Sequence, residues 1–343
     1  MSPPSVTPTG ELVAVTRAAL VAWLGRDDLD VQQIGGGASN LTFAVRTGRE
    51  ELVLRRPPAF VTPTSNDMRR EWTVLRALAR TDVPVPRVVR TCEDPAVLGV
   101  PFYLMERLDG IVFRSAQDVG HLDVRESREC TEELIRVLAA LHALDPETVG
   151  LEDFGRPEGF LARQVRRWTK QWERTAFAEV PEIDEVSRRL AAAVPPSGPP
   201  AIVHGDYSFN NTMFHREPPT RMLGVLDWEL STIGDPMTDV GMLALYWGDI
   251  GASIWTGQQA HRANPGFGTS AAMLERYAAV SGRDLGGIDF HLALATFKMA
   301  VIVAGARART VGVDPDRTRT LEDKTRMLAS VALEATDDFA GAW

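Results

Sequence analysis

Residues 204–211 read HGDYSFNN, and residues 226–229 read LDWE. The first stretch has the spacing H-x-D-x-x-x-x-N between apolar residues, and the apolar run at 222–226 ends directly before Asp227. This pattern predicts that Asp206 and Asn211 share a loop between two short strands, and that Asp227 follows a third strand. Kinase chemistry requires a carboxylate beside the attacking hydroxyl and oxygen ligands for magnesium. The joint spacing therefore favours a phosphotransferase over an ordinary Asp/Asn-rich turn.

Three other motifs surround these two stretches. Residues 35–40 read GGGASN, residues 101–110 read PFYLMERLDG and residues 234–239 read GDPMTD. Together the motifs resemble the aminoglycoside phosphotransferase / choline kinase family over nearly the whole chain. The segments LRRPP at 54–58, RQVRRW at 163–168 and LDWELST at 226–232 are more similar to one branch, the kinase-like domain fused to some acyl-CoA dehydrogenases.

The resemblance implies an α+β, bilobal protein-kinase-like fold. Residues 1–108 would form a small antiparallel-sheet N-lobe that binds nucleotide, with an N-terminal helix, and residues 109–343 a larger, mainly helical C-lobe with the catalytic loop and substrate pocket. Periodicity and turn residues agree with this division. Strands are expected at 30–34, 41–46, 51–55 and 100–105, and helices at 11–24, 67–79, 125–144, 159–178 and 183–193. Another helix is expected to start at residues 235–236, where Asp and Pro favour a helix N-terminus.

The motifs suggest a role for each polar residue of the predicted catalytic loop. Asp206 is the candidate general base, which would orient the substrate hydroxyl and accept its proton. Asn211 and Asp227 are the candidate magnesium ligands, because Mg²⁺ needs few protein oxygens beside phosphate and water. His204 is expected to order the loop by hydrogen bonding. By resemblance, Asp239 would brace the loop backbone.

The glycine run and the apolar strand at 100–105 are the candidate nucleotide contacts. Glycine permits close approach of the backbone to phosphate, although glycines between strands are also common turn residues. The amide groups expected to line the phosphates belong to Gly36, Gly37, Ala38, Ser39 and Asn40. By resemblance, the backbone from Glu106 to Leu108 would contact adenine.

The N-lobe lacks the lysine that protein kinases use to bind the α- and β-phosphates. The chain has only three lysines, Lys170, Lys298 and Lys324. Arg55 occupies the corresponding strand position, and Glu71 opens the helix where its partner is expected. Arg keeps the charge, but its planar fork differs in length and shape from lysine. Strand alternation favours Arg55, on the same face as Val53, although Arg56 remains an alternative.

Five basic residues form one stripe on the predicted helix 159–178. They lie at helical offsets 0, 3, 4, 7 and 11, and are Arg163, Arg166, Arg167, Lys170 and Arg174. One interpretation is a solvated face with buried tryptophans beside it. The other is a platform for an anionic substrate such as a CoA thioester, whose phosphates suit arginine.

Composition restricts the partners and the compartment. The formal charge of −9 over 343 residues argues against a nucleic-acid-coating protein. Cys92 and Cys130 are too few for a disulfide framework, which fits a reducing cytoplasm. The first residues lack a signal-peptide layout, and Lys298 interrupts the longest apolar run, so no membrane span is expected.

The expected function is ATP- and magnesium-dependent transfer of the γ-phosphate to a hydroxyl of a small molecule, with an anionic or acyl-CoA-like metabolite as candidate acceptor. An aminoglycoside kinase is the first alternative, although the basic stripe argues against a cationic substrate. A nucleotide-binding pseudokinase or interaction module is the second, because Arg55 replaces lysine. The sequence fixes neither the acceptor nor the oligomeric state.

Overall fold

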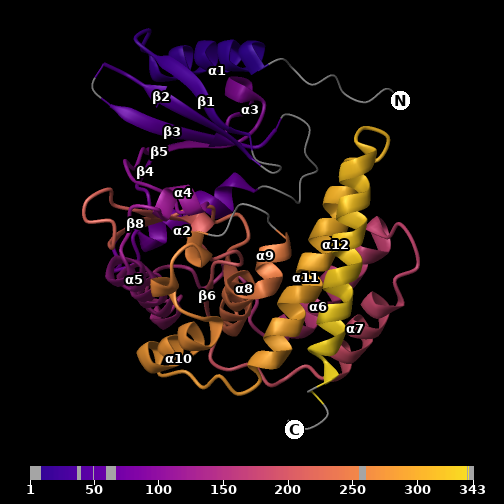
Figure 1. Ribbon diagram of the computed structural model, residues 1–343. Helices are drawn as coiled ribbons and strands as arrows, with labels where there is room; N and C mark the ends of the chain where they lie inside the picture. The colour runs from indigo at the N-terminus through magenta and orange to yellow at the C-terminus, as the bar shows by residue number, and fades with distance from the viewer. Residues whose placement is uncertain are drawn as a thin grey trace. The chain divides into compact units, whose positions relative to one another are not determined.

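A computed structural model describes residues 9–36, 40–48, 50–58, 67–254, 260–337 and 339. The chain divides into two compact units, the first formed by residues 1–109 with 223–229 and the second by residues 110–222 with 230–343. The first contains an antiparallel sheet and the second is mainly helical, as the predicted fold class requires (Figure 1).

The first unit is a five-stranded antiparallel sheet with three helices. Its strands have the order β1-β2-β3-β5-β4. The elements are α1 (Thr9–Leu24), β1 (Asp30–Gly36), β2 (Leu41–Arg46), β3 (Glu51–Arg56), α2 (Met68–Leu78), β4 (Val88–Cys92), α3 (Pro95–Leu98) and β5 (Phe102–Glu106). Strand β4 was not predicted, because it is a short edge strand with mostly half-buried side chains and a register irregularity between Val88 and Arg90.

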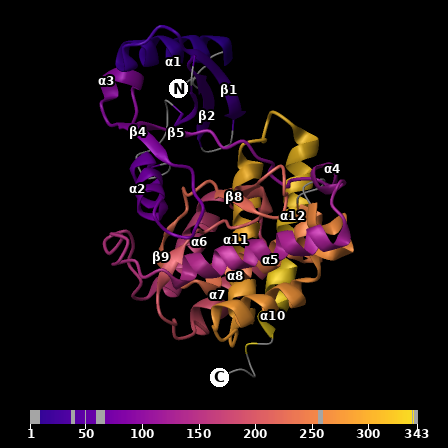
Figure 2. The ribbon, with the colours of Figure 1, turned by 90° about the vertical axis from the view of Figure 1, so that its left-hand side faces the viewer.

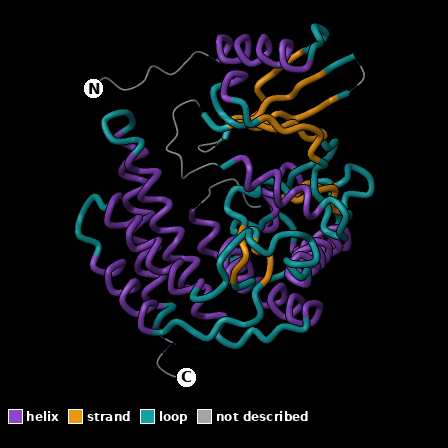
Figure 3. The backbone as a smooth tube through the Cα atoms, turned by 180° about the vertical axis from the view of Figure 1, so that it is seen from behind, coloured by secondary structure: helices purple, strands orange, loops and turns teal. Residues whose placement is uncertain are grey.

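The two faces of this sheet carry different side chains. On one face, Phe43 and Leu54 pack in the core that Leu20 of α1 also enters, and α1 runs along this side of the sheet (Figure 3). The alternate residues of β3 lie on the other face, where Arg55 is directly opposite Tyr103 of β5. Period-two alternation therefore presents Arg55 on the face away from the α1 core, as the sequence pattern indicated.

The second unit consists of helices around short strands. Its helices are α4 (Ala116–Val119), α5 (Val124–Ala143), α6 (Phe160–Thr175), α7 (Pro181–Ala192), α8 (Met237–Trp247), α9 (Asp249–Ile254), α10 (Ser270–Ser281), α11 (Ile288–Ala308) and α12 (Pro315–Glu334). The short strands are β6 (Ala201–Val203), β7 (Thr212–Phe214), β8 (Met222–Val225) and β9 (Thr232–Gly234), and β6 pairs with β9. Strand β8 begins in this unit and continues into the first.

Helix α11 lies at the centre of the helical core. It packs against α6, α7, α8 and α12, and Figure 2 shows it among these helices. By length and composition α11 could cross a membrane, but 67% of its most apolar 18-residue window is buried inside the protein. Phe297 and Val301 have no exposed surface. The apolar sequence of α11 is therefore explained by its place in the core.

Side-chain caps set several helix ends. Asp123 and Glu126 form a capping box at the start of α5. Helix α8 begins at Met237, whose N–H donates to Asp235 Oδ1 at 2.9 Å. The Asp-Pro sequence at 235–236 thus marks the start of this helix to within two residues, and it places Asp239 in the first turn.

Residues 223–229 belong to the first unit, which corrects the predicted assignment of all residues after 108 to the second. Val225 N–H donates to the carbonyl oxygen of Pro84 at 2.8 Å. A Cβ on Gly224 would lie 2.4 Å from Leu108 Cδ1, so glycine is needed for this close approach. These contacts bring Asp227 into the first unit, next to the sheet face that carries Arg55.

Candidate active site

The loop after β6 is held by one buried carboxylate. The N–H groups of His204 and Gly205 donate to Asp239 Oδ2 and Oδ1, both at 2.7 Å. Gly205 has φ of 85°, and a Cβ there would lie 2.8 Å from the carbonyl oxygen and the Cβ of Leu230. Glycine is therefore required between His204 and Asp206 on grounds of both conformation and space. The predicted bracing role of Asp239 is confirmed.

Asp239 is fully buried, and its charge is compensated on a second side. His142 Nε2 lies 3.2 Å from Asp239 Oδ2, and His142 Nδ1 lies 2.7 Å from the Tyr277 hydroxyl. Burial by itself would raise the pKa of Asp239, but the hydrogen bonds and the nearby histidines leave the pKa below its usual value. His142 is buried and supports the brace.

Replacing Asp239 by asparagine should destabilise the protein. The amide has one acceptor oxygen and a donating nitrogen, so one buried loop N–H loses its partner. We expect the free energy of unfolding to fall by about 1–3 kcal/mol in urea titrations. Asp316→Asn is the control, because the Asp316 side chain is 95% exposed. Equal stability of Asp239→Asn and wild type would contradict the bracing role.

Asp206 is positioned through both carboxylate oxygens. Oδ1 accepts a hydrogen bond from the Tyr246 hydroxyl at 2.7 Å, and Oδ2 accepts one from Asn211 Nδ2 at 2.8 Å. The backbone N–H of Asp206 donates to His204 Nδ1 at 3.2 Å, so His204 orders the loop as expected. Burial raises the pKa of Tyr246 well above its usual value, so Tyr246 acts as a donor to the carboxylate.

Asn211 fits the predicted role of a magnesium ligand. It lies in a short 3-10 turn at Phe209–Asn211, and Nδ2 donates to both the carbonyl oxygen and the carboxylate of Asp206. Its amide nitrogen is therefore occupied within the loop. The remaining side-chain atom is Oδ1, a hard oxygen donor of the kind that Mg²⁺ prefers.

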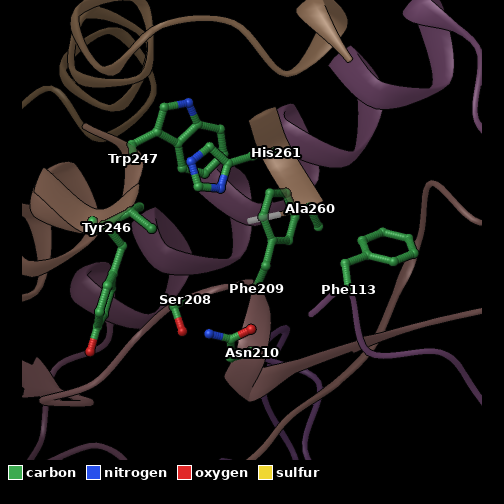
Figure 4. Close-up of a pocket in the computed structure, with 10 residues that line it drawn as sticks. Phe113, Ser208, Phe209, Asn210, Tyr246, Trp247, Ala260 and His261 are labelled. Carbon is green, nitrogen blue, oxygen red and sulfur yellow. The ribbon is translucent and has the colours of Figure 1, made fainter. Parts of the chain in front are cut away.

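A small pocket, with about 20 Å³ of space for water-sized molecules, lies next to this loop, and Figure 4 shows its lining. Its residues are Phe113, Ser208, Phe209, Asn210, Leu243, Tyr246, Trp247, Gly251, Ala260 and His261. Tyr246 links the pocket to the loop that carries Asp206, because the same side chain lines the pocket and donates to Asp206. The described lining residues include no carboxylate, lysine or arginine.

His261 stacks on Trp247 with ring centroids 4.9 Å apart (Figure 4). Burial lowers the pKa of His261 to about 4, with the neighbouring Arg262 acting in the same direction. The imidazole is therefore neutral at physiological pH. The described part of the pocket offers an uncharged, aromatic surface with a few hydrogen-bonding groups.

The first unit contains a second polar cluster, centred on Arg55. Arg55 Nη2 donates to Glu71 Oε1 and to Asp227 Oδ1, both at 3.1 Å, and Arg55 Nε lies 3.1 Å from Glu71 Oε2. The predicted pairing of Arg55 with Glu71 is confirmed. Arg56 is also buried, and its Nε donates to the carbonyl oxygen of Pro57 at 3.2 Å.

Three carboxylates gather around Arg55. The groups are those of Glu71, Asp227 and Glu229, with oxygen atoms that all lie within 4.8 Å of one another. Burial by itself would lower the pKa of Arg55, but these carboxylates raise the pKa above its usual value. Arg55 therefore stays charged, and its charge offsets part of the repulsion between the acids.

Two further features of this cluster fit a bound cation. Asn40 Nδ2 donates to Glu71 and Glu229, each at 3.0 Å, while Asn40 Oδ1 is buried and has no hydrogen-bond partner. Asp227 has φ of 63°, in the left-handed region that non-glycine residues seldom adopt. The oxygen donors suit Mg²⁺, and the strained backbone of Asp227 is typical of a functional position.

The remaining predicted nucleotide contacts are described in part. Gly36 ends β1, and Gly37, Ala38 and Ser39 lie outside the described residues. In the hinge, the N–H of Glu106 donates to the carbonyl oxygen of Arg87 at 2.9 Å. This amide is therefore already used within the sheet, whereas the Leu108 N–H bonds to no other residue that the structure describes.

Comparison with known proteins identifies the family. The sequence model of the phosphotransferase enzyme family matches residues 30–278. The chain belongs to this family. A crystal structure from Ralstonia eutropha JMP134, assigned as an aminoglycoside phosphotransferase, superposes with a TM-score of 0.80 at 33% identity and covers 94% of this chain and 98% of that one.

The acyl-CoA dehydrogenase relatives of this chain are longer proteins. Mouse acyl-CoA dehydrogenase family member 10 is 30% identical over 98% of this phosphotransferase-family chain, and human family member 11 is 33% identical over 82% of it. The chain spans about a third of the length of these relatives, 32% and 36% respectively. Aminoglycoside phosphotransferase APH(4)-Ia, solved with ADP and hygromycin B, has a TM-score of 0.64 at 16% identity and coverage of 93% and 98%. At this identity, the similarity to APH(4)-Ia shows a shared fold.

Proposed function

We propose that this protein is an ATP- and magnesium-dependent small-molecule kinase that transfers the γ-phosphate to a hydroxyl group. The observation that carries the proposal is the geometry of Asp206. Its carboxylate is presented by a loop fixed at Asp239, and it is oriented through hydrogen bonds from Tyr246 and Asn211. A carboxylate held in this way is suited to orient an acceptor hydroxyl and to accept its proton.

The first unit supplies the groups suited to the nucleotide. Arg55 carries the positive charge that the missing lysine would provide, and Glu71 and Asp227 fix its guanidinium. Asp227 and Asn211 would hold magnesium against the phosphates, where the metal would neutralise charge during transfer. Nucleotide use is supported by the structural neighbours, which include complexes with ADP and with GDP.

The acceptor is proposed to be an anionic or acyl-CoA-like metabolite. On α6, the side chains of Arg166, Arg167 and Lys170 are exposed, and none forms an ion pair with a described residue. Trp172 is buried beside them and Trp168 is half-buried. Unpaired arginine and lysine on one helix face suit phosphate or carboxylate groups. A polycationic aminoglycoside would instead be repelled by this basic helix face.

MgATP binding tests the proposed function directly. Calorimetry should detect binding in the micromolar to millimolar range, and thermal unfolding should move to higher temperature with MgATP. At a free ligand concentration of 100 times Kd, the expected stabilisation is about 2.7 kcal/mol. ADP release should then be screened against CoA thioesters, hydroxy acids and aminosugars. Folded protein that binds no MgATP at millimolar concentration would rule out the kinase.

A further inference from the structure

Lys298 is a charged residue in an apolar core helix. It lies in α11 between Phe297 and Met299, which are both buried, and its own side chain is half-buried. Among the described residues, no carboxylate lies within ion-pair distance of its ammonium group. A partly buried ammonium without a counter-ion is unfavourable for stability alone. The position of Lys298 is therefore better explained by its contact with the loop that carries Asp206.

The ammonium group of Lys298 contacts the catalytic loop. Nζ donates to the carbonyl oxygen of Gly205 at 2.7 Å, in the peptide group that joins Gly205 to Asp206. The peptide N–H on the other side of Gly205 donates to Asp239. Helices α8 and α11 therefore fix the backbone directly before the candidate base from two sides, with an anion and a cation.

Charges around Lys298 come from three elements. Burial lowers the pKa of Lys298, the carboxylates of Asp206 and Asp239 act to raise it, and Arg167 of α6 lowers it further. Trp168, also on α6, has its ring centroid 5.7 Å from Nζ, a cation–π contact that partly replaces lost hydration. The positive charge of Lys298 is thus kept close to Asp206 without being neutralised in an ion pair.

We propose that Lys298 is a positioning residue for phosphoryl transfer, which holds the Gly205–Asp206 peptide and supplies positive charge beside the base. The proposal rests on the proposed kinase function. During transfer the acceptor oxygen forms a bond to the γ-phosphorus, the bond from that phosphorus to the bridging oxygen breaks, and ADP leaves. The hydroxyl proton passes to Asp206. The hydrogen bond from Lys298 to the Gly205 carbonyl oxygen holds the peptide that carries Asp206 in place for this step.

Lys298→Met keeps the length of the side chain and removes its charge. We expect kcat to fall roughly 10–100-fold, the range for loss of a charged hydrogen bond, with the Kd of MgATP unchanged. The probe is MgATP alone, with slow transfer to water measured as ADP release, so the acceptor need not be known. Lys324→Met is the matched control, because Lys324 Nζ also donates to a carbonyl oxygen at 2.7 Å, that of Ile254, and should leave kcat unchanged.

Lys298→Arg separates the role of charge from that of packing. We expect it to retain more activity than Lys298→Met. In wild type, kcat should decrease at alkaline pH as Lys298 loses its proton, at a pH below that of a free lysine. This alkaline limb should be absent in Lys298→Arg, because the guanidinium does not titrate there.

Two results would overturn the proposal. The first is wild-type kcat in Lys298→Met. The second is an equal loss of kcat and of stability in urea in the Met and Arg variants, with the decrease of kcat at alkaline pH still present in Lys298→Arg. That result would mean that Lys298 has a structural role alone. If the wild-type protein neither binds MgATP nor releases ADP, the proposed kinase function fails. This outcome differs from the two results above, which both require an active wild-type protein.

Discussion

Replacement of Asp206 by asparagine or alanine should reduce phosphoryl transfer by ~10²–10⁴-fold while MgATP binds with nearly wild-type affinity. The carboxylate is the proton acceptor in the proposed reaction, and its oxygens contact Tyr246 and Asn211. Loss of the base affects the transition state and leaves nucleotide contacts in place. Single-turnover ADP formation and calorimetry with MgATP measure the two effects separately.

Asp227→Ala should be compared with the Asp206 variants for both MgATP affinity and turnover. Asp227 pairs with Arg55 in the first unit, so its removal should weaken productive MgATP binding as well as turnover. Tyr246→Phe should have a smaller effect than Asp206→Asn, since it removes one hydrogen bond to the base and keeps the carboxylate. Equal activity of wild type and Asp206→Ala on the true acceptor would show that another group takes the proton.

Local sequence signals predicted the geometry of the loop from His204 to Asn211 well. The interval from His204 to Asn211 fixed which side chains share one turn, because a short loop between two strands leaves little freedom. Strand alternation favoured Arg55 over Arg56 as the partner of Glu71, and the structure shows the Arg55–Glu71 pair. These predictions succeeded because each depended on residues close together in sequence or on a regular period.

The partners missed by the sequence come from distant segments. Tyr246 lies 40 residues after Asp206 in an apolar helix, where a tyrosine resembles any core aromatic residue. Glu229 and Tyr103 join Glu71 only after the sheet and residues 223–229 have assembled. Lys298 was visible as a polar interruption of an apolar helix. Its contact with Gly205 depends on how α11 packs, which no local pattern encodes.

Arg55→Ala should impair both stability and nucleotide use. Glu71 is 1% exposed, and without Arg55 its buried carboxylate would keep, among the described residues, the hydrogen bonds from Tyr103 and Asn40. Removing one partner of a buried ion pair typically costs about 3–5 kcal/mol. We expect a loss of this size in urea unfolding, together with a higher KM for ATP and a lower kcat.

The double variant Arg55→Met, Glu71→Gln separates these two effects. It removes both charges and keeps similar volumes, so stability should recover relative to Arg55→Ala. MgATP affinity should stay low, because the phosphates still lack their cation. Recovery of both stability and MgATP affinity would show that Arg55 serves the fold and leaves phosphate binding to another residue.

Arg55→Lys tests whether the site depends on the guanidinium fork. Arg55 contacts Glu71 through Nε and Nη2 and contacts Asp227 through Nη2. Lysine is shorter and has a single nitrogen, so it cannot reproduce both contacts, and activity should fall below wild type. Activity equal to or above wild type would mean that any cation suffices at this position. A neutral Arg55→Ala with a damaging Arg56→Ala would transfer the phosphate-binding role to Arg56, against the strand register seen here.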